Sequence, residues 1–439
     1  MNNNVLIIGS GGREHALAWK LKQSSKVEKI FIAPGNPGTA GFGINIDIKP
    51  TDFNALIEFA KKENIALTVV GPDDPLALGI VNAFQDQNLK IWGPTRKAAQ
   101  IEASKAFSKE LMKKNRVPTA NFETFHEYKK ALEYLDKKGT PIVIKASGLA
   151  LGKGVTVCQN LNDAKDALKK AMVDKVFGDA GSVVVIEEFL EGVEFSTHAF
   201  CDGSSFSLLP ASQDHKPVFN DDKGPNTGGM GTIAPLPWVD QNLMNEVAER
   251  IVRPMLDGMK KDGMTFEGLL YPGLMAVKGA LWQDSQRAPL TLKVIEFNAR
   301  FGDPETQSYM RLLKTDLFDI LTASVNGDLE SINIEWENKY ACCIVLASGG
   351  YPGSYKKSLP ITGIEKAEEM DNVVVFHAGT AIKDKNLVTN GGRVLGVTAI
   401  DDNLQGALDK AYKAVKLIHF EGMHFRTDIG AKSVALTKN

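Results

Sequence analysis

The chain has 439 residues, and its 51 lysines and arginines are balanced by 53 aspartates and glutamates, which gives a formal net charge of −2. This balance excludes broad binding along a nucleic-acid backbone as the main activity. The length exceeds what one hydrophobic core supports, so we expect two to four domains. No apolar run approaches the length of a membrane span, and the four cysteines form no C-x-x-C pair. We therefore expect a reduced cytoplasmic protein that binds neither membranes nor nucleic acid and has no cysteine-based zinc site.

The first hundred residues alternate short apolar runs with amphipathic stretches. Strands are predicted at residues 5–8, 30–33, 66–70 and 90–92, and helices at residues 14–21, 53–62 and 76–84. Strands separated by helices predict βαβ units in a parallel sheet. Glycine or proline follows each strand, and the carboxyl ends of parallel strands are where such sheets bind ligands.

The remaining chain falls into two further parts. A basic helix at 104–120 leads to a small α/β block at about 121–192, and a strand-rich segment with a helix at about 240–261 continues to about 330. The last part has predicted strands near 340–347, 373–377 and 393–400 and a helix at about 403–419. We therefore expect an α/β and α+β multidomain protein with domains at 1–103, 104–330 and 331–439.

A glycine-rich turn, GSGGRE at 9–14, follows the first strand and precedes a helix. A dinucleotide fingerprint would need a third glycine at Glu14 and an acid after the second strand, and both are missing. Backbone N–H groups of Gly11 and Gly12 at a helix N-terminus, beside Arg13, suit one phosphate. The alternative is a tight glycine turn without a ligand.

A second glycine-rich segment, KASGLALGKGV at 145–155, lies between two strands rather than between a strand and a helix. It therefore differs from a P-loop, which also needs glycine at 147 and a hydroxyl at 154. Backbone at Gly152 and Gly154 could approach phosphates closely, and the amine of Lys145 could reach one. The alternative is an ordinary hairpin with solvated lysines.

The segment VIEFNARFGDPE at 294–305 carries the clearest chemical pattern. Glu296 and Asn298 project to the same face of a strand, and their hard oxygen atoms suit Mg²⁺ that is also bound by nucleotide phosphates. Arg300 follows on that face and could stabilise charge on a transferring phosphoryl or acyl group. The alternative is a structural ion pair between Glu296 and Arg300.

Two other segments leave their role open. The strand and turn at 184–194 are either a solvated edge or a connector that reads adenine, with Glu194 accepting ribose hydroxyls. The glycine-dense loop at 224–231 has no packing reason for its glycines, and such loops bring backbone close to a substrate.

Taken together, these segments resemble the phosphoribosylamine–glycine ligase family of the ATP-grasp superfamily, over nearly the whole chain and in order. The motifs that carry the resemblance are IIGSGGREHA at 7–16, APGNPGT at 33–39, VVGPDDPLALG at 69–79, SKAF at 104–107, IKASGLALGKGV at 144–155, EEFLEGVEFS at 187–196, SQDHK at 212–216, GPNTGGMG at 224–231, VIEFNARFGDPETQ at 294–307, SGGYPG at 348–353 and GGRVLGVT at 391–398. The resemblance implies an ATP-grasp fold with an N-terminal parallel α/β domain and a small C-terminal α/β domain.

The family resemblance also implies an activity: ATP, glycine and 5-phospho-β-D-ribosylamine give ADP, phosphate and glycinamide ribonucleotide through glycyl phosphate, the second step of purine synthesis. ATP would lie between a lid at about 121–192 and the strand-rich body. Its partners would be Lys105 and Lys145 for phosphates, Glu187, Phe189 and Glu194 for adenosine, and Glu296 and Asn298 for Mg²⁺ or Mn²⁺.

For the glycine and acyl-phosphate pocket the candidates are Asp214, Lys216, Arg300 and Asp303. The alternatives are an ATP-grasp ligase for another acid or amine, a nucleotide-dependent oxidoreductase and a binding module without catalysis. Because the charge is near neutral and no heptad repeat is present, we expect a monomer.

Overall fold

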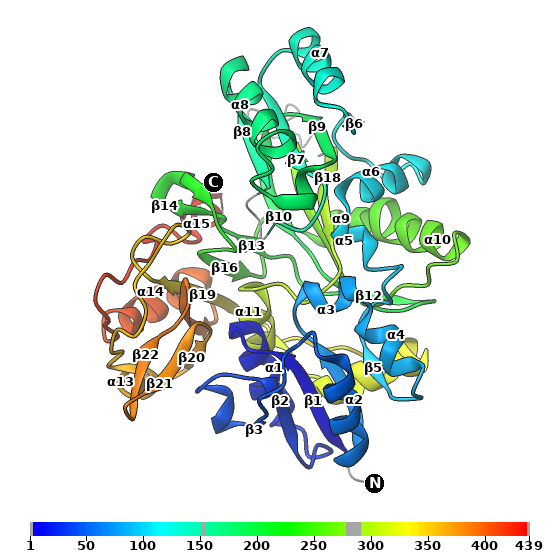
Figure 1. Cartoon of the computed structure of the whole chain (residues 1–439). Coiled ribbons are helices and arrows are strands. Elements are labelled where there is room, and N and C mark those ends of the chain that lie inside the picture. Colours follow the sequence, from blue (N-terminus) through cyan, green and yellow to red (C-terminus); the bar gives the residue numbers. More distant parts are fainter. Residues whose placement is uncertain (1–2, 151–153, 278–290, 437–439) are drawn as a thin grey trace.

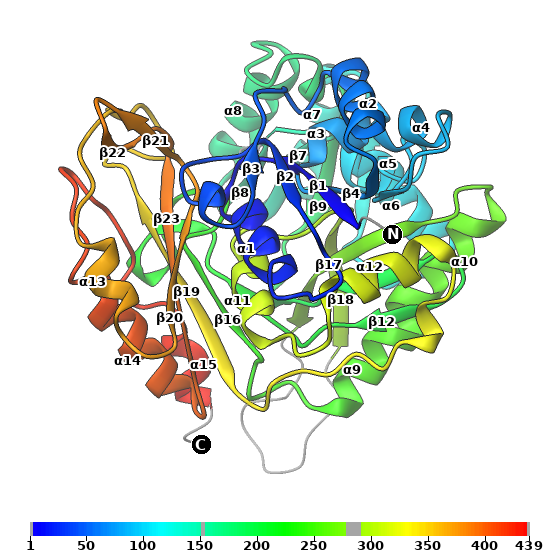
Figure 2. The same cartoon turned by 90° about the horizontal axis from the view of Figure 1, so that it is seen from below.

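The computed structural model describes residues 3–150, 154–277 and 291–436, and Figures 1 and 2 show it in two perpendicular views. In Figure 1 an α/β unit formed by the first hundred residues lies opposite a small unit that carries α7 and α8. The C-terminal residues form a third unit at the side of the molecule. Among the helices of the described residues, none is both long and apolar enough to cross a membrane.

The N-terminal unit is a parallel sheet in the order β3-β2-β1-β4-β5, as predicted. Its elements are β1 (Asn4–Gly9), α1 (Gly12–Leu21), β2 (Ile30–Pro34), β3 (Ile44–Asn45), α2 (Phe53–Lys62), β4 (Ile65–Val70), α3 (Asp73–Leu78), α4 (Ile80–Gln85) and β5 (Ile91–Trp92). Every residue of β1 is buried, which is why this strand is a continuous apolar run. The helix expected at 76–84 is divided, because Gly79 has a left-handed φ of 97° between α3 and α4.

The small unit is an antiparallel sheet in the order β6-β9-β7-β8 with two helices packed on it. Its elements are β6 (Phe122–Phe125), α7 (Tyr128–Lys138), β7 (Ile142–Ala146), β8 (Val155–Cys158), α8 (Leu161–Met172) and β9 (Val184–Glu188). Apolar residues of α7 and α8 cover one face of the sheet, which leaves the other face free for the site described below.

The central unit is an antiparallel sheet in the order β10-β17-β11-β12, in which β18 also pairs with β17. Its strands are β10 (Gly192–Ser196), β11 (Ala199–Asp202), β12 (Phe206–Leu208), β17 (Glu267–Val277) and β18 (Thr291–Asn298). Its helices are α5 (Gln100–Ala103), α6 (Lys105–Lys114), α9 (Gln241–Val247), α10 (Arg253–Lys261), α11 (Glu305–Leu312) and α12 (Leu317–Asn326). The helix predicted at 240–261 is continuous but contains a π-helical turn at Ala248–Val252 between α9 and α10.

The C-terminal sheet has the order β13-β16-β19-β23-β20 and draws its first two strands from the middle of the chain. Its strands are β13 (Gln213–Asp214), β16 (Gly231–Ala234), β19 (Tyr340–Ala347), β20 (Val373–His377) and β23 (Arg393–Asp401). The hairpins β14 (Pro217–Phe219) with β15 (Lys223–Asn226) and β21 (Thr380–Lys383) with β22 (Asn386–Thr389), and the helices α13 (Ile364–Glu368), α14 (Leu404–Val415) and α15 (Ala431–Leu436), complete it. The proposed domain limit at 330 is therefore crossed by strand pairing, because Thr232 of β16 lies opposite Cys343 of β19.

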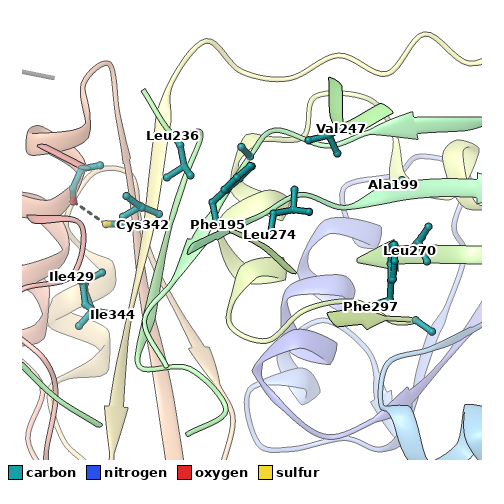
Figure 3. Close-up of a cluster of buried hydrophobic side chains, with 14 of the residues drawn as sticks. Phe195, Ala199, Leu236, Val247, Leu270, Leu274, Phe297, Cys342, Ile344 and Ile429 are labelled. Carbon is teal, nitrogen blue, oxygen red and sulfur yellow. Dashed lines mark hydrogen bonds between the residues drawn. The ribbon is translucent and has the colours of Figure 1, made fainter. Parts of the chain in front are cut away.

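One buried apolar cluster joins the central sheet to the C-terminal sheet (Figure 3). Phe195, Leu270 and Phe297 contribute from the central side, and Ile344 and Ile429 from the C-terminal side. A shared core of this kind fixes the relative positions of the two units. Residues that line one cavity can therefore come from both units.

Candidate active site

A cavity of about 610 Å³ opens between the small sheet and the central sheet. Strands β7, β8 and β9 line one side, and β17 and β18 line the other. Arg13 from the N-terminal unit and Arg393 from the C-terminal unit also reach it. A volume of this size is typical of a small-molecule site.

An ion cluster lies on the side of the cavity formed by the small sheet. The Nζ atoms of Lys109 and Lys145 both lie 3.0 Å from Oε2 of Glu187, and all three side chains are almost fully buried. Lys145 Nζ also donates to the carbonyl of Ile295 at 3.1 Å, which ties β7 to β18. The other carboxylate oxygen of Glu187, Oε1, is buried without a described hydrogen-bond partner. A buried acceptor facing a cavity is suited to a donor group on a ligand.

Lys109 of this cluster and the nearby Lys105 lie in surroundings that disfavour their positive charge. Burial lowers the pKa of Lys109 to about 8, and the attraction of Glu187 opposes this shift. Burial also lowers the pKa of Lys105, the first residue of α6, while the charge of Glu296 opposes it. Positive groups kept partly desolvated in a cavity are suited to an anion such as a phosphate.

Glu296 and Asn298 lie on β18 opposite Gly273 and Tyr271 of β17, and both line the cavity. Burial opposes the charge of Glu296, but the positive charges of Lys216, Lys105 and Lys145 outweigh it and hold its pKa at about 2. The described residues contain no cluster of three His, Cys, Asp or Glu side chains that could hold a metal by themselves. An ionised carboxylate with a neighbouring amide oxygen fits a metal ion whose other ligands come from phosphates and water.

Lys216 pairs with two carboxylates of the central sheet. Its Nζ lies 2.6 Å from Oε1 of Glu194 and 3.5 Å from Oε1 of Glu296. Burial disfavours its charge, yet the surrounding carboxylates, Glu194 first among them, raise its pKa above the ordinary value. Lys216 is therefore a fixed positive charge between the residues predicted for ribose and for metal.

Arg300 pairs with an acid that the sequence analysis did not identify. Its Nε lies 3.2 Å from Oε1 of Glu102, and Oε2 of Glu102 accepts a hydrogen bond from the N–H of Ala299 at 2.7 Å. The guanidinium of Arg300 also lies over the ring of Tyr271. Among the described residues, Arg300 pairs with Glu102 and Glu296 pairs with Lys216, so the alternative of a Glu296–Arg300 ion pair is not found.

Two further acids, Asp214 of β13 and Glu305 of α11, also line the cavity. Asp214 Oδ1 accepts a hydrogen bond from the N–H of His215 at 2.7 Å, and Glu305 Oε1 accepts one from the hydroxyl of Tyr271 at 2.5 Å. Burial and the charge of Glu305 raise the pKa of Asp214 well above its ordinary value, against the charge of Lys216. Two buried acids in one cavity favour either a shared proton or a cationic ligand group.

The turn predicted to bind phosphate already has an acid, Glu14, that accepts hydrogen bonds from two of its donors. Glu14 accepts a hydrogen bond from the N–H of Gly11 through Oε2 and one from Nε of Arg13 through Oε1, both at 2.5 Å. Nη1 of Arg13 donates to the carbonyl of Phe301 at 3.1 Å. Arg13 lines the cavity, whereas Gly11 and Gly12 are not among its lining residues.

Most residues predicted from the sequence lie on this one cavity. Those that line it are Arg13, Lys105, Lys145, Gly154, Glu187, Phe189, Glu194, Asp214, Lys216, Glu296, Asn298, Arg300 and Asp303. Gly152 lies outside the described residues. The structure adds Glu102, Lys109, Tyr271, Glu305, Tyr351 and Arg393, which the sequence analysis did not assign. Three of these, Glu305, Tyr351 and Arg393, belong to motifs quoted above, but nothing in their local pattern distinguishes them from surface or core residues.

Family models and relatives identify the family of this chain. The chain matches the N domain, the ATP-grasp (A) domain and the C domain of phosphoribosylglycinamide synthetase at residues 3–102, 103–306 and 341–432. The chain belongs to the phosphoribosylglycinamide synthetase family. Members of this family use ATP together with a divalent metal ion, and the predicted ATP-grasp fold and ligase activity in purine biosynthesis are confirmed.

Two curated relatives and one solved structure illustrate the match. The phosphoribosylamine–glycine ligase of Chlorobaculum tepidum is 48% identical over 434 residues, which covers 98% of this chain and 100% of that protein. That of Caldanaerobacter subterraneus subsp. tengcongensis is 46% identical over 427 residues, or 97% and 99% of the two chains. The crystal structure of the Thermotoga maritima phosphoribosylamine–glycine ligase aligns with a TM-score of 0.82 at 32% identity, covering 97% of this chain and 100% of that one.

Proposed function

We propose that this chain joins glycine to 5-phospho-β-D-ribosylamine and converts ATP to ADP and phosphate, with glycyl phosphate as the intermediate. The observation that carries this proposal is a single cavity that combines buried lysines with the Glu296–Asn298 pair. Lysines suit phosphates, and the Glu296–Asn298 pair would suit a divalent metal ion, so one metal–nucleotide complex could contact both groups.

In this proposal the small sheet covers ATP. Lys105 and Lys145 bind its phosphates, and the backbone at Gly154 approaches them. Oε1 of Glu187, which has no hydrogen-bond partner among the described residues, accepts a hydrogen bond from the amino group of adenine. The adenosine is bounded by Phe189 and by Glu194, whose carboxylate accepts ribose hydroxyls.

The metal would be held by the carboxylate of Glu296 and the amide oxygen of Asn298. A divalent ion, which we propose to be Mg²⁺ with Mn²⁺ as a substitute, supplies charge neutralisation on the phosphates. The low pKa of Glu296, about 2, keeps this ligand ionised at every pH at which the enzyme would work.

The chemistry requires orientation and charge compensation more than a nucleophilic side chain. A carboxylate oxygen of glycine attacks the γ-phosphorus and ADP leaves. The amine nitrogen of the ribosylamine then attacks the carbonyl carbon, phosphate leaves with the transferred oxygen, and the nitrogen loses one proton. Arg300 and Lys216 stabilise the negative charge in both steps, while Asp214 and Asp303 hold the amino groups.

The phosphate of the ribosylamine is proposed to bind near Gly11, Gly12 and Arg13. Arg13 lines the same cavity, so this end of the substrate could be held while its amine faces the acyl group. We further propose that the chain acts as a monomer in the cytoplasm, where its four buried free thiols would stay reduced.

ADP release is the experiment that tests this function. It is measured with glycine, freshly prepared phosphoribosylamine and ATP, and then with glycine or the amine omitted in turn. We expect full turnover only with all three substrates. Turnover with another amino acid or amine, at a higher rate than with this pair, would overturn the assignment in favour of another ATP-grasp ligase.

A further inference from the structure

The C-terminal motifs SGGYPG and GGRVLGVT form one structural unit to which the proposed function assigns no role. The N–H and hydroxyl of Ser348 donate to the carbonyls of Gly392 and Gly391, both at 2.8 Å. A Cβ on residue 392 would lie 2.2 Å from the ring of Tyr351, so only glycine allows these two segments to pack. The two turns therefore present Tyr351 and Arg393 side by side to the cavity.

Both side chains contact the glycine-dense loop of the central part of the chain. Nη1 of Arg393 donates to the carbonyl of Gly228 at 2.5 Å, and the hydroxyl of Tyr351 accepts a hydrogen bond from the N–H of Gly228 at 3.1 Å. A Cβ on residue 228 would lie 2.9 Å from the guanidinium carbon of Arg393. This close contact is a packing reason for a glycine in the loop.

Arg393 also holds the turn that precedes α11. Nη1 donates to the carbonyl of Asp303 at 2.5 Å, and Nη2 lies 3.4 Å from Oδ2 of the same residue. The carboxylate of Asp303 is further fixed by Nε2 of Gln307, which donates to Oδ1 at 2.8 Å. One guanidinium thus joins a loop, a turn and the C-terminal unit, and the planar fork of donors in arginine suits such multiple contacts.

We propose that Arg393 is a positioning residue of the active site: it fixes the loop at Gly228 and the carboxylate of Asp303, so that the pocket for the amino acid and the amine is complete only with the C-terminal unit docked. The nucleotide end lies on the other side of the cavity, around Lys145 and Glu187. Loss of Arg393 should therefore impair the acyl-transfer half of the site and leave the nucleotide half unchanged. This inference rests on the proposed function.

The test compares Arg393→Met and Arg393→Lys with Arg311→Met by steady-state kinetics. Arg311 also bridges to the C-terminal unit, since its Nη2 donates to the carbonyl of Asn372 at 2.9 Å, but it does not line the cavity. We expect Arg393→Met to reduce kcat/KM for glycine and for phosphoribosylamine at least tenfold, with KM for ATP within twofold of wild type. Arg393→Lys should recover only part of this loss, and Arg311→Met should behave as wild type.

A further variant, Gly228→Ala, keeps the charge but displaces the guanidinium, and we expect it to reproduce the loss. Three results would overturn the inference. They are wild-type kinetics in Arg393→Met, an equal loss of kcat/KM in Arg311→Met, and a rise in KM for ATP in Arg393→Met that matches the loss of kcat/KM for the other two substrates. If Arg393→Met does not fold, full activity of Arg393→Lys overturns it and a tenfold loss with unchanged KM for ATP supports it. A wild-type chain without ligation activity would instead overturn the proposed function, so the two failures are distinguishable.

Discussion

Replacement of Arg300 by methionine separates a catalytic role from a structural one, because the structure identifies its ion-pair partner. Arg300 and Glu102 are 20% and 10% exposed, and their charged atoms are 3.2 Å apart. At that distance, with an effective dielectric constant of about 20, their attraction is about 5 kcal/mol. Removal of one partner from a buried pair usually costs about 3–5 kcal/mol, so Arg300→Met should lower the melting temperature as well as the rate.

The double variant Glu102→Gln/Arg300→Met resolves the two effects. Glutamine keeps an acceptor for the N–H of Ala299 and removes the unpaired charge, so stability should return to within about 1 kcal/mol of wild type. If Arg300 also stabilises the transferring group, kcat should remain about 10²–10³-fold lower, which is the usual loss for one preorganised donor.

The assay is ADP release at saturating substrates, with thermal unfolding of the same preparations as the measure of stability. Glu102→Gln alone controls for loss of the acid and should retain a kcat within about tenfold of wild type. Recovery of kcat in the double variant together with stability would refute a catalytic role for Arg300. A rate change of less than threefold in Arg300→Met would refute it as well.

Three further predictions follow from the site and its surroundings. Glu296→Ala and Asn298→Ala should each abolish turnover without unfolding the chain, as measured by ADP release and circular dichroism. Lys109→Met should raise KM for ATP about tenfold, because Glu187 loses one of the two ammonium groups that hold it. His15→Asn should make the melting temperature less sensitive to acid, because burial, and then the charge of His377, lower the pKa of His15 to about 3 in the folded chain. Below pH 6.5 the unfolded chain therefore binds more protons at this residue than the folded chain does. The free energy of unfolding of the wild type should fall between pH 6.5 and pH 3 for this reason, by about 2 kcal/mol at pH 5.

The Lys109 prediction has a matched control. Lys113 lies on the same helix as Lys109 and over the same ring of Phe122, so Lys113→Met should leave KM for ATP unchanged. An equal rise in both variants would contradict the role of Lys109. Normal kinetics in Glu296→Ala or Asn298→Ala would contradict the assignment of these residues to the metal. For His15→Asn, the melting temperature is compared between pH 7.5 and pH 5, and a difference equal to that of the wild type would contradict the histidine argument.

The sequence predicts those features that depend on local pattern. The buried strand at 5–8 is a continuous apolar run, and Glu296 and Asn298 follow the two-residue period of a strand, so both features can be predicted from the sequence. The pairing of β16 with β19 cannot be predicted in this way, because Thr232 and Cys343 are more than a hundred residues apart and nothing in either segment indicates its partner strand.

The same limit applies to the partners of the site residues. Arg393 and Gly228 are 165 residues apart in the sequence, and Arg300, which follows β18, pairs with Glu102 of α5. A motif specifies which side chain carries the chemistry, but the neutralising or positioning partner is decided by tertiary packing. For this reason the sequence indicates Glu187 and Asp303, whereas Lys109 and Arg393 can be identified only from the folded structure.

The most direct test of the acyl-phosphate chemistry uses glycine labelled with ¹⁸O in both carboxylate oxygens. If the carboxylate is phosphorylated and the amine then displaces phosphate, each turnover transfers one ¹⁸O atom to inorganic phosphate and leaves one in the amide product. Mass spectrometry of the phosphate should therefore show one label for each molecule of product. Phosphate without label, formed at the same rate as the product, would contradict phosphorylation of the carboxylate and with it the central claim.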